Sequence, residues 1–469
     1  SDSYQPLSVR ANTMAGQDLK IDPGWAWDPF VPDKKNPWSR RHAAHLYRRA
    51  GFGAPSATLD EAVRLGLSRT IKQLVSSRPA AGGFDREMAS MARSITATGK
   101  PQQLSAWWLY RMVTTPDQVL EKTTLFWHGH FATSAAKVED PQMMLAQNSL
   151  LRRHALGRFE SMVQGMSRDP AMLIWLDSTT NRRIRPNENY ARELLELFCL
   201  GLGNYTEKDI AEIARAFTGW EVVNGRFVFS AFQHDTGNKV FLGANGNYGG
   251  DEAIRIVLGQ PAAARFIARK LVHFFVCEEP SLPDAVIEPL AKQLASEGFE
   301  LRPVVSRILA SNIMFSRHAV GRKVRSPVEL AVGLLRCLEG TADMFKLAEA
   351  LERIGQGVFF PPSVKGWDGG RTWIDSASLL GRANLVRHLV VDGGDRFGKS
   401  GLRDLVEQHG RGDPQDTIDW LLEMLVAVPI PPKARQLLVD LARSRSAGAN
   451  DRWSRVIHAI STIPEFQLC

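Results

Sequence analysis

Acidic and amide side chains gather in one stretch of the chain, NENYARELLELFCLGLGNYTEKDIAEIARAFTGW, which runs from Asn187 to Trp220. Carboxylic acids placed close together can give and take protons as a general acid and a general base. An arginine beside them can hold an anionic group or tune the pKa of a glutamate. The candidate catalytic acids here are Glu188, Glu193 and Glu196. The candidate substrate-binding residues here are Asn187, Asn189 and Arg192.

The spacing of apolar residues predicts one helix from about Glu188 to Leu200, with its apolar arc toward the core. Glu188, Arg192 and Glu196 follow one another at i, i+4 and i+8 on the opposite side. A solvated helix face explains this pattern, with Glu–Arg pairs that contribute about 0.2–0.5 kcal/mol each. A second helix is predicted directly afterwards, so the acidic side could instead face a neighbouring element. Both interpretations remain open.

Two histidines lie one residue apart in the aromatic run FWHGHF, at positions 128 and 130. In a helix they point roughly 200° apart, so at most one of them enters a cleft shared with the acids. A buried, hydrogen-bonded structural histidine is the ordinary alternative for either. Neutral histidine is also a common metal ligand and proton shuttle. His130 is therefore a candidate catalytic residue, and His128 is a candidate only as a metal ligand.

A third group of polar residues follows in the segment FQHDTGNKVFLG. His234 and Asp235 are candidate catalytic residues because loops at strand ends present side chains to ligands. An ordinary turn explains the same residues equally well. If the protein were instead a metal enzyme, nitrogen and oxygen ligands of this kind would suit Fe, Mn, Cu or Zn. The candidate metal ligands are then His128, His130, His234 and Glu193.

Aromatic residues are abundant, with twelve tryptophans in 469 residues. The loop GQGVFFPPSVKGWDGGRTW is rich in glycine, proline and tryptophan and is predicted to be ordered. Flat aromatic rings on loops can cover the apolar faces of sugars, although core packing explains most tryptophans. The candidate substrate-binding residues are the tryptophans Trp127, Trp220, Trp367 and Trp373, together with Asp368, which lies beside Trp367.

Composition limits the class of protein. Apolar residues make up 44% and charged residues 23% of the chain, as in globular proteins, and no uninterrupted apolar run approaches 18 residues. The four cysteines are far apart, which argues against a zinc module or a disulfide scaffold and leaves two single pairings open. The net charge of +8 is scattered along the chain and is ordinary for a mildly basic soluble protein; the alternative is an anionic partner such as an acidic polysaccharide or a membrane surface. No nucleic-acid-binding module accompanies that charge.

Helical periodicity dominates from Ser39 onward and predicts a mainly α fold, either a multi-helical bundle or an α/α-type array. One short β-hairpin is expected at about 221–233, where Asn224 and Gly225 separate two β-branched or aromatic runs. We expect an irregular N-terminal arm at 1–38, a helical core domain at 39–400 and a C-terminal helical segment at 401–469 packed on that core.

Several long motifs, in this order, resemble one family: AAHLYRRAGFGAP, FWHGHFATS, RPNENYARELLELFCLGLGNYTEKDIAEIARAFTGW, HDTGNKVFLG, ARFIARKLVHFFV, KVRSPVELAVGLLR and FFPPSVKGWDGGRTWIDSASLLGRANL. The sequence is identified as a member of the bacterial domain-of-unknown-function family 1800, over roughly residues 40–469. The resemblance implies a bacterial and often exported protein, commonly found alongside a sulfatase-like partner family. It implies no particular activity.

Three functions are compatible with these residues. The leading hypothesis is a periplasmic or secreted hydrolase, with its signal peptide removed, that cleaves a glycan or acidic surface polymer by Glu/Asp/His acid–base catalysis without a cofactor. The alternatives are a divalent-metal enzyme, such as an oxidase or metallohydrolase, and a non-catalytic partner of an exported sulfatase-like protein. The first hypothesis requires the polar side of the 188–200 helix to share a hollow with the two histidine segments. A serine nucleophile has no support, because no GxSxG motif is present.

Overall fold

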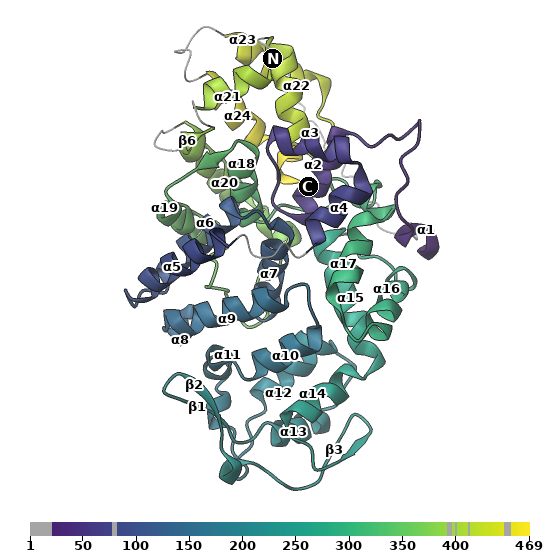
Figure 1. The fold of residues 1–469 in the computed structure, drawn as a ribbon, viewed down its shortest axis with the longest axis vertical. Coiled ribbons are helices and arrows are strands. Elements are labelled where there is room, and N and C mark those ends of the chain that lie inside the picture. The colour runs from purple at the N-terminus through teal and green to yellow at the C-terminus, as the bar shows by residue number, and fades with distance from the viewer. Residues whose placement is uncertain (1–20, 77–81, 392–395, 399–400, 411–412, 445–451) are drawn as a thin grey trace, which may run out of the picture.

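The computed structural model describes residues 21–76, 82–391, 396–398, 401–410, 413–444 and 452–469 (Figure 1). The structure is 63% helical, and its few strands form short two-stranded antiparallel sheets. The predicted mainly α fold is confirmed. Of the predicted N-terminal arm, residues 1–20 lie outside the described residues, and the remainder carries one short helix.

Helices alternate with short connections along the first part of the chain, which includes the helix that ends in the two histidines. They are α1 (Pro23–Trp27), α2 (Arg40–Ala50), α3 (Ser56–Leu65), α4 (Leu67–Val75), α5 (Phe84–Thr96), α6 (Gln102–Thr114), α7 (Gln118–His130), α8 (Ala135–Val138) and α9 (Pro141–His154). Helix α1 is anchored by Trp27, whose indole Nε1–H donates to the carbonyl oxygen of Val286 at 2.6 Å.

The middle of the chain holds the acidic stretch and most of the strands (Figure 1). Its helices are α10 (Phe159–Ser167), α11 (Pro170–Trp175), α12 (Asn189–Glu193), α13 (Glu207–Ala216), α14 (Gly250–Leu258), α15 (Pro261–Phe275), α16 (Asp284–Ser296) and α17 (Leu301–Ala310). Its strands are β1 (Trp220–Val223), β2 (Arg226–Phe229), β3 (Lys239–Phe241) and β4 (Ala244–Gly246).

The predicted hairpin is confirmed as β1 paired with β2, with Val223 opposite Arg226 across the turn. Asn224 and Gly225 take φ values of 50° and 73°. Positive φ at both central residues defines the type I′ turn, whose twist matches that of the flanking strands. The β3–β4 hairpin was not predicted from the sequence.

The last part of the chain is again helical and includes the aromatic loop GQGVFFPPSVKGWDGGRTW. Its elements are α18 (Pro327–Cys337), β5 (Gly340–Thr341), α19 (Met344–Arg353), α20 (Ser376–Val390), β6 (Arg396–Phe397), α21 (Leu402–His409), α22 (Pro414–Leu425), α23 (Pro432–Arg443) and α24 (Arg452–Thr462). The single-turn 3₁₀ helices are Ser178–Thr180, Ala231–Gln233, Ile313–Phe315, Gly370–Trp373 and Pro464–Gln467.

Buried apolar side chains form two large clusters. One contains Trp127, Phe198 and Leu271 and lies around α7, α10, α13 and α15. The other joins α6 and α18 to the C-terminal helices, and Val439 and Ile457 belong to it. The helices after residue 401 therefore pack on earlier helices, while the predicted domain boundaries stay a prediction.

Two sequence-based expectations about the chain's chemistry can be compared with the structure. All four cysteines are buried and unpaired, so neither of the two possible disulfides is formed. Among the described residues, no helix combines the length and apolar character needed to cross a lipid bilayer.

Candidate functional site

The acidic stretch does not form the single α-helix predicted from the sequence. Helix α12 ends at Glu193, and Leu194–Cys199 continue as a π-helix in which the N–H of Leu200 bonds the carbonyl oxygen of Leu195 at 2.9 Å. A π-helix widens the turn and changes the direction of the residues that follow, which periodicity analysis at 3.6 residues cannot predict. Single π-turns of this kind are frequent at functional sites.

The predicted catalytic residue His130 bonds the end of the π-helix. The imidazole Nε2–H of His130 donates to the carbonyl oxygen of Phe198 at 3.0 Å, and the ammonium of Lys270 donates to that of Leu197 at 3.3 Å. Burial and the charge of Lys270 hold the pKa of His130 well below its ordinary value. His130 is 5% exposed and neutral, so its position is that of a structural histidine satisfying a helix end.

The first turn of the stretch faces solvent and is engaged in local contacts. The guanidinium of Arg192 binds both carboxylate oxygens of Glu207 at 2.9 and 2.8 Å, and it lies 3.4 Å from the carboxylate of Glu188. The side-chain amide of Asn187 donates to the hydroxyl of Thr180 at 2.9 Å. That of Asn189 donates to the carbonyl oxygen of Leu176. For Glu188 and Arg192, the solvated-face interpretation is the one the contacts support.

Glu193 and Glu196 differ from that first turn because both are only partly exposed. Burial, followed by the charge of Glu196, raises the pKa of Glu193 above its ordinary value. The phenol of Tyr205 donates a hydrogen bond to the carboxylate of Glu196 at 3.1 Å. The π-helix junction therefore holds one carboxyl whose pKa is raised, Glu193, and a second, Glu196, that accepts a hydrogen bond from a phenol.

The remaining histidine candidates lie elsewhere. His128 accepts the backbone N–H of Phe359 at 3.0 Å, and burial lowers its pKa to about 3. His234 donates from Nδ1 to the carbonyl oxygen of Thr218 at 2.9 Å. The carboxylate of Asp235 is paired with Arg215 at 2.8 Å, which lowers its pKa. The turn interpretation therefore describes His234 and Asp235.

Among the described residues the three candidate imidazoles bond backbone groups in different places, and only His130 contacts the π-helix that carries Glu196. The metal candidates His128, His130, His234 and Glu193 do not converge. The described residues contain no group of three or more His, Cys, Asp or Glu side chains that could hold a metal ion. The predicted set of metal ligands is therefore not assembled among the described residues. Its donors lie on α7, on α12 and in the segment after β2, and they do not come together.

Two predicted substrate-binding tryptophans belong to the core. Trp127 is fully buried, and its Nε1–H donates to the carbonyl oxygen of Ala155 at 2.9 Å. Trp220 is 5% exposed and packs edge-on against Phe217 and Phe227. Neither presents a ring face to a ligand, and the core-packing interpretation is correct for both.

The aromatic loop does bring predicted residues together. Trp367, Asp368 and Trp373 line a cavity of about 350 Å³ between the C-terminal end of α19 and the start of α20. This volume lies within the range of small-molecule sites. Trp367 is partly exposed and Trp373 is 8% exposed. Polar lining residues that the sequence analysis did not single out are Arg353, Thr372, Asp375 and Ser378. The only indication of these residues in the sequence was their position, at the end of one predicted helix or near the start of the next.

The same loop contacts α7 and approaches the π-helix. A Cβ at Gly366, which has a φ of 82°, would collide with the carbonyl oxygen of Gly129 between the two histidines, so only glycine permits this approach. Lys365 binds Asp368 at 2.5 Å, and its charge helps to lower the pKa of Lys270 to about 8 after the larger effect of burial. Lys270 is the residue that binds the π-helix carbonyl, so the cavity and the Glu193–Glu196 pair belong to adjoining elements.

A buried ionic cluster contacts the aromatic loop. Glu329 lies 2.5 Å from the ammonium of Lys122 and 2.8 Å from that of Lys323, and Lys323 lies 3.9 Å from Glu278. The carboxylate of Glu278 lies against Gly370 of the aromatic loop, and burial raises its pKa. Its Oε2 atom has no hydrogen-bond partner among the described residues. The cluster joins α7 and the start of α18 to the segment that follows α15, where Glu278 contacts the aromatic loop.

Replacing Glu329 is expected to destabilise the fold. The substitution Glu329→Gln leaves two ammonium groups buried without their shared carboxylate, which costs about 3 kcal/mol of unfolding free energy. Urea denaturation at pH 7.5 measures the loss. Glu288→Gln is the matched control, because its pair with Arg265 is partly exposed, and it should change stability by less than about 1 kcal/mol. Equal losses in both variants would contradict the assigned role of the cluster.

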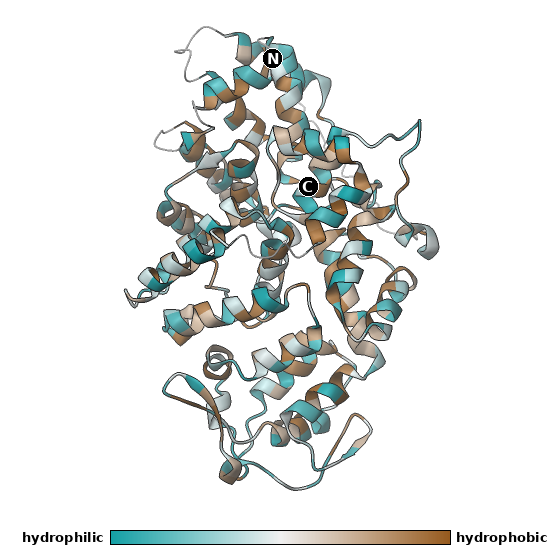
Figure 2. Cartoon of the chain, in the orientation of Figure 1, coloured by the Kyte–Doolittle hydropathy of each residue, from teal (hydrophilic) through white to brown (hydrophobic). Residues whose placement is uncertain are grey.

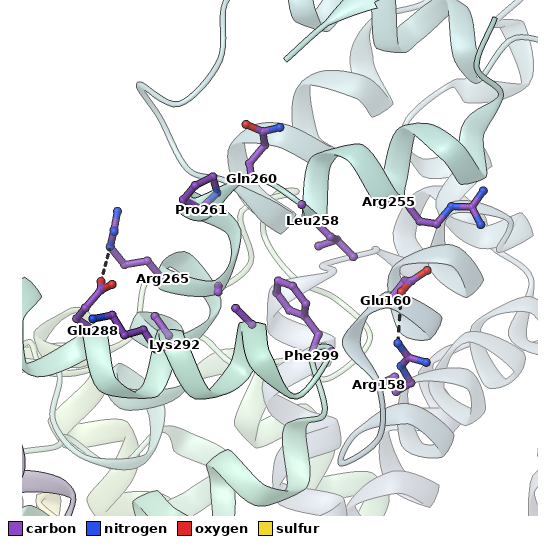
Figure 3. A pocket seen from close by; sticks show the side chains of 15 residues that line it. Arg158, Glu160, Arg255, Leu258, Gln260, Pro261, Arg265, Glu288, Lys292 and Phe299 are labelled. Carbon is purple, nitrogen blue, oxygen red and sulfur yellow. Dashed lines mark hydrogen bonds and ion pairs between the residues drawn. The ribbon is translucent and has the colours of Figure 1, made fainter. Parts of the chain in front are cut away.

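Two further hollows were not predicted from the sequence. One, of about 480 Å³, lies where the α14–α15 turn meets α16, and Figure 3 shows its Arg265–Glu288 and Arg158–Glu160 pairs. The other, of about 870 Å³, lies between α2, α3 and α22 and contains the Arg435–Asp419 pair. In both hollows these arginines already have carboxylate partners. The aromatic cavity is the one that combines two indole rings with hydroxyl and carboxylate groups.

Comparison with known families decides the relationship suggested by the sequence motifs. A family model described as "Protein of unknown function (DUF1800)" matches residues 45–468, which is nearly the whole chain. The chain belongs to the DUF1800 family. No curated protein and no solved structure matched this DUF1800 chain.

Proposed function

We propose that the protein binds a glycan or an acidic surface polymer in the cavity lined by Trp367 and Trp373. The observation that carries the proposal is the convergence of two indole rings with Asp368 in a hollow of small-molecule size. Sugar rings have apolar faces that pack on indoles and hydroxyl groups that bond to carboxylates and hydroxyls. Arg353 at the rim suits a carboxylate or sulfate carried by an acidic sugar.

Hydrolysis of the bound polymer is the second part of the proposal and is assigned to Glu193 and Glu196. The raised pKa of Glu193 suits a general acid, and the Tyr205-bonded Glu196 suits a general base. The aromatic loop approaches Gly129 of α7 at Gly366, and His130 of the same helix bonds Phe198 of the π-helix. This adjacency supports a polymer that extends from the cavity to the Glu193–Glu196 pair. No cofactor is needed for such a reaction.

The cellular setting is part of the same proposal. An exported, periplasmic or secreted protein meets surface polymers, and the family resemblance supports export. The net charge of +8 supports an anionic substrate. A non-catalytic role beside a sulfatase-like partner shares the binding site but requires no turnover, so the two are distinguished by cleavage assays.

Substitution of Trp367 tests the binding site. Trp367→Ala removes the exposed ring and is expected to weaken oligosaccharide binding about 10- to 100-fold, because a stacked aromatic ring contributes about 1.5–3 kcal/mol. Calorimetric titration with neutral and acidic oligosaccharides measures the dissociation constants. Trp25→Ala is the matched control, since Trp25 is 43% exposed on α1 outside the cavity. Unchanged binding by Trp367→Ala, or no binding of any oligosaccharide by the wild-type protein, would refute the proposed site.

A further inference from the structure

Large apolar side chains are exposed together near the β1–β2 hairpin. Ile184 is 85% exposed, Phe232 71% and Phe229 49%. They lie on the 182–185 loop, the 3₁₀ helix Ala231–Gln233 and the end of β2, at the end of the molecule opposite α23 (Figures 1 and 2). Exposed apolar residues that cluster in this way mark interaction surfaces more often than isolated ones do.

Arginines surround these side chains. Arg182, Arg183, Arg185 and Arg226 are all exposed, and within the described residues none of them pairs with a carboxylate. The guanidinium of Arg183 lies 4.6 Å above the ring of Phe232. Of the nearby acids, Asp235 binds Arg215 and Glu188 lies beside Arg192. Glu221 on β1 leaves one carboxylate beside these four arginines, so the net charge of the surface is positive. The surface therefore combines net positive charge with exposed apolar rings and chains.

Backbone contacts hold the segments that carry this surface. The N–H of Arg183 bonds the carbonyl oxygen of Gln233 at 2.8 Å, and that of Ser230 bonds Gly219 at 2.7 Å. Arg182 and Arg185 also form an isolated β-bridge. The side chains of Ile184 and Phe232 are thus kept outward by a paired backbone, and neither residue lines any of the three hollows described above.

We propose that this cationic apolar surface, defined by Arg182–Arg185, Arg226, Phe229 and Phe232, docks on an anionic lipid bilayer. Guanidinium groups bind lipid phosphates in bidentate fashion, and each basic group near an anionic surface adds to the attraction. Ile184 and Phe232 enter the headgroup boundary, where apolar and aromatic side chains bury their area. A soluble acidic polymer would use the arginines alone and would leave these apolar side chains in water. The inference is independent of the glycan site.

Vesicle binding of the full chain tests the inference. Wild-type protein is expected to sediment with vesicles of phosphatidylcholine mixed with phosphatidylglycerol and to remain in solution with phosphatidylcholine alone. The double variant Ile184→Ser/Phe232→Ser and the triple variant Arg182→Gln/Arg183→Gln/Arg185→Gln should each lower the partition coefficient about tenfold or more. Circular dichroism confirms that each variant is folded.

Matched controls come from exposed residues elsewhere. Leu437→Ser/Phe345→Ser removes two chains that are 61% and 54% exposed, and Arg69→Gln/Arg86→Gln/Arg93→Gln removes three exposed charges. Both controls should bind the mixed vesicles as the wild type does. No binding to mixed vesicles, equal binding to both vesicle types, or equal losses in the controls would overturn the inference. Binding of acidic polysaccharide that depends on the arginines, with Ile184→Ser/Phe232→Ser binding mixed vesicles normally, would also overturn it.

Discussion

Glu193→Gln is expected to lower polymer cleavage about 10²- to 10⁴-fold while leaving the melting temperature within a few degrees of the wild type. The amide is nearly isosteric with the carboxyl group but cannot deliver its proton to a leaving group. Because burial and the charge of Glu196 raise the pKa of Glu193, the wild-type rate should fall as pH rises through that raised value. Release of reducing ends from the oligosaccharide that binds best measures both effects.

Glu207→Gln provides the matched control for this prediction. Glu207 lies on the neighbouring helix α13, and its exposed carboxylate binds Arg192. Its loss should leave the cleavage rate within about twofold. Full activity in Glu193→Gln would remove this residue from the mechanism. Binding without any cleavage by the wild-type protein would instead favour the non-catalytic role beside an exported partner.

Mild acid is expected to destabilise the protein strongly because three buried histidines stay neutral when it is folded. Burial lowers the pKa of His128 to about 3, and burial with nearby cations holds those of His45 and His130 well below 6.5. Their folded pKa values are depressed, so their stabilising effect is present above pH 6.5 and is lost as pH falls below it. Each group costs about 2 kcal/mol at pH 5 relative to pH 7.5.

Asp169 changes the free energy of unfolding in the opposite direction as the pH falls. Burial raises its pKa to about 6, so its protonation below that pH stabilises the fold by about 1.4 kcal/mol at pH 5. These four groups together are expected to cost about 4–5 kcal/mol between pH 7.5 and pH 5, measured from urea denaturation midpoints. His130→Gln should remove about 2 kcal/mol of this dependence whatever its stability at pH 7.5. A midpoint that stays constant from pH 7.5 to pH 5 would disprove the neutral-histidine assignment.

Local sequence signals were sufficient for the elements that local chemistry determines. Asn224 and Gly225 take the positive φ values of a type I′ turn, which favours these two residue types. The two histidines of α7 point to different neighbours, as helical spacing requires: His128 meets Phe359 and His130 meets Phe198. The mainly α fold follows from the same periodicity.

The site was predictable only in part because its contacts are distant in sequence. The π-helix at Leu194–Cys199 depends on His130 and Lys270 reaching its last carbonyls, and no local pattern indicates either contact. Glu188 and Glu193 are five residues apart and similar in sequence context, yet the first is exposed and the second is partly buried. Trp127 and Trp367 are chemically equivalent, and only tertiary packing separates the core residue from the cavity residue.

The buried ionic cluster was likewise not predictable from the sequence. Lys122 lies in α7, whereas Lys323 and Glu329 lie just before and within α18, and in the sequence all three resemble ordinary charged surface positions. A buried cluster of this kind is stable only when every charge is paired, because desolvation is costly. It fixes Glu278 under the aromatic loop at Gly370 and so helps to position the cavity.

A crystal structure of the protein with its tightest-binding oligosaccharide would locate the ligand in the molecule. We expect a sugar ring packed on the indole of Trp367, with hydroxyl groups bonded to Asp368 and the polymer directed toward Glu193. A saccharide bound in either of the other two hollows, with the cavity between α19 and α20 left to solvent, would contradict it.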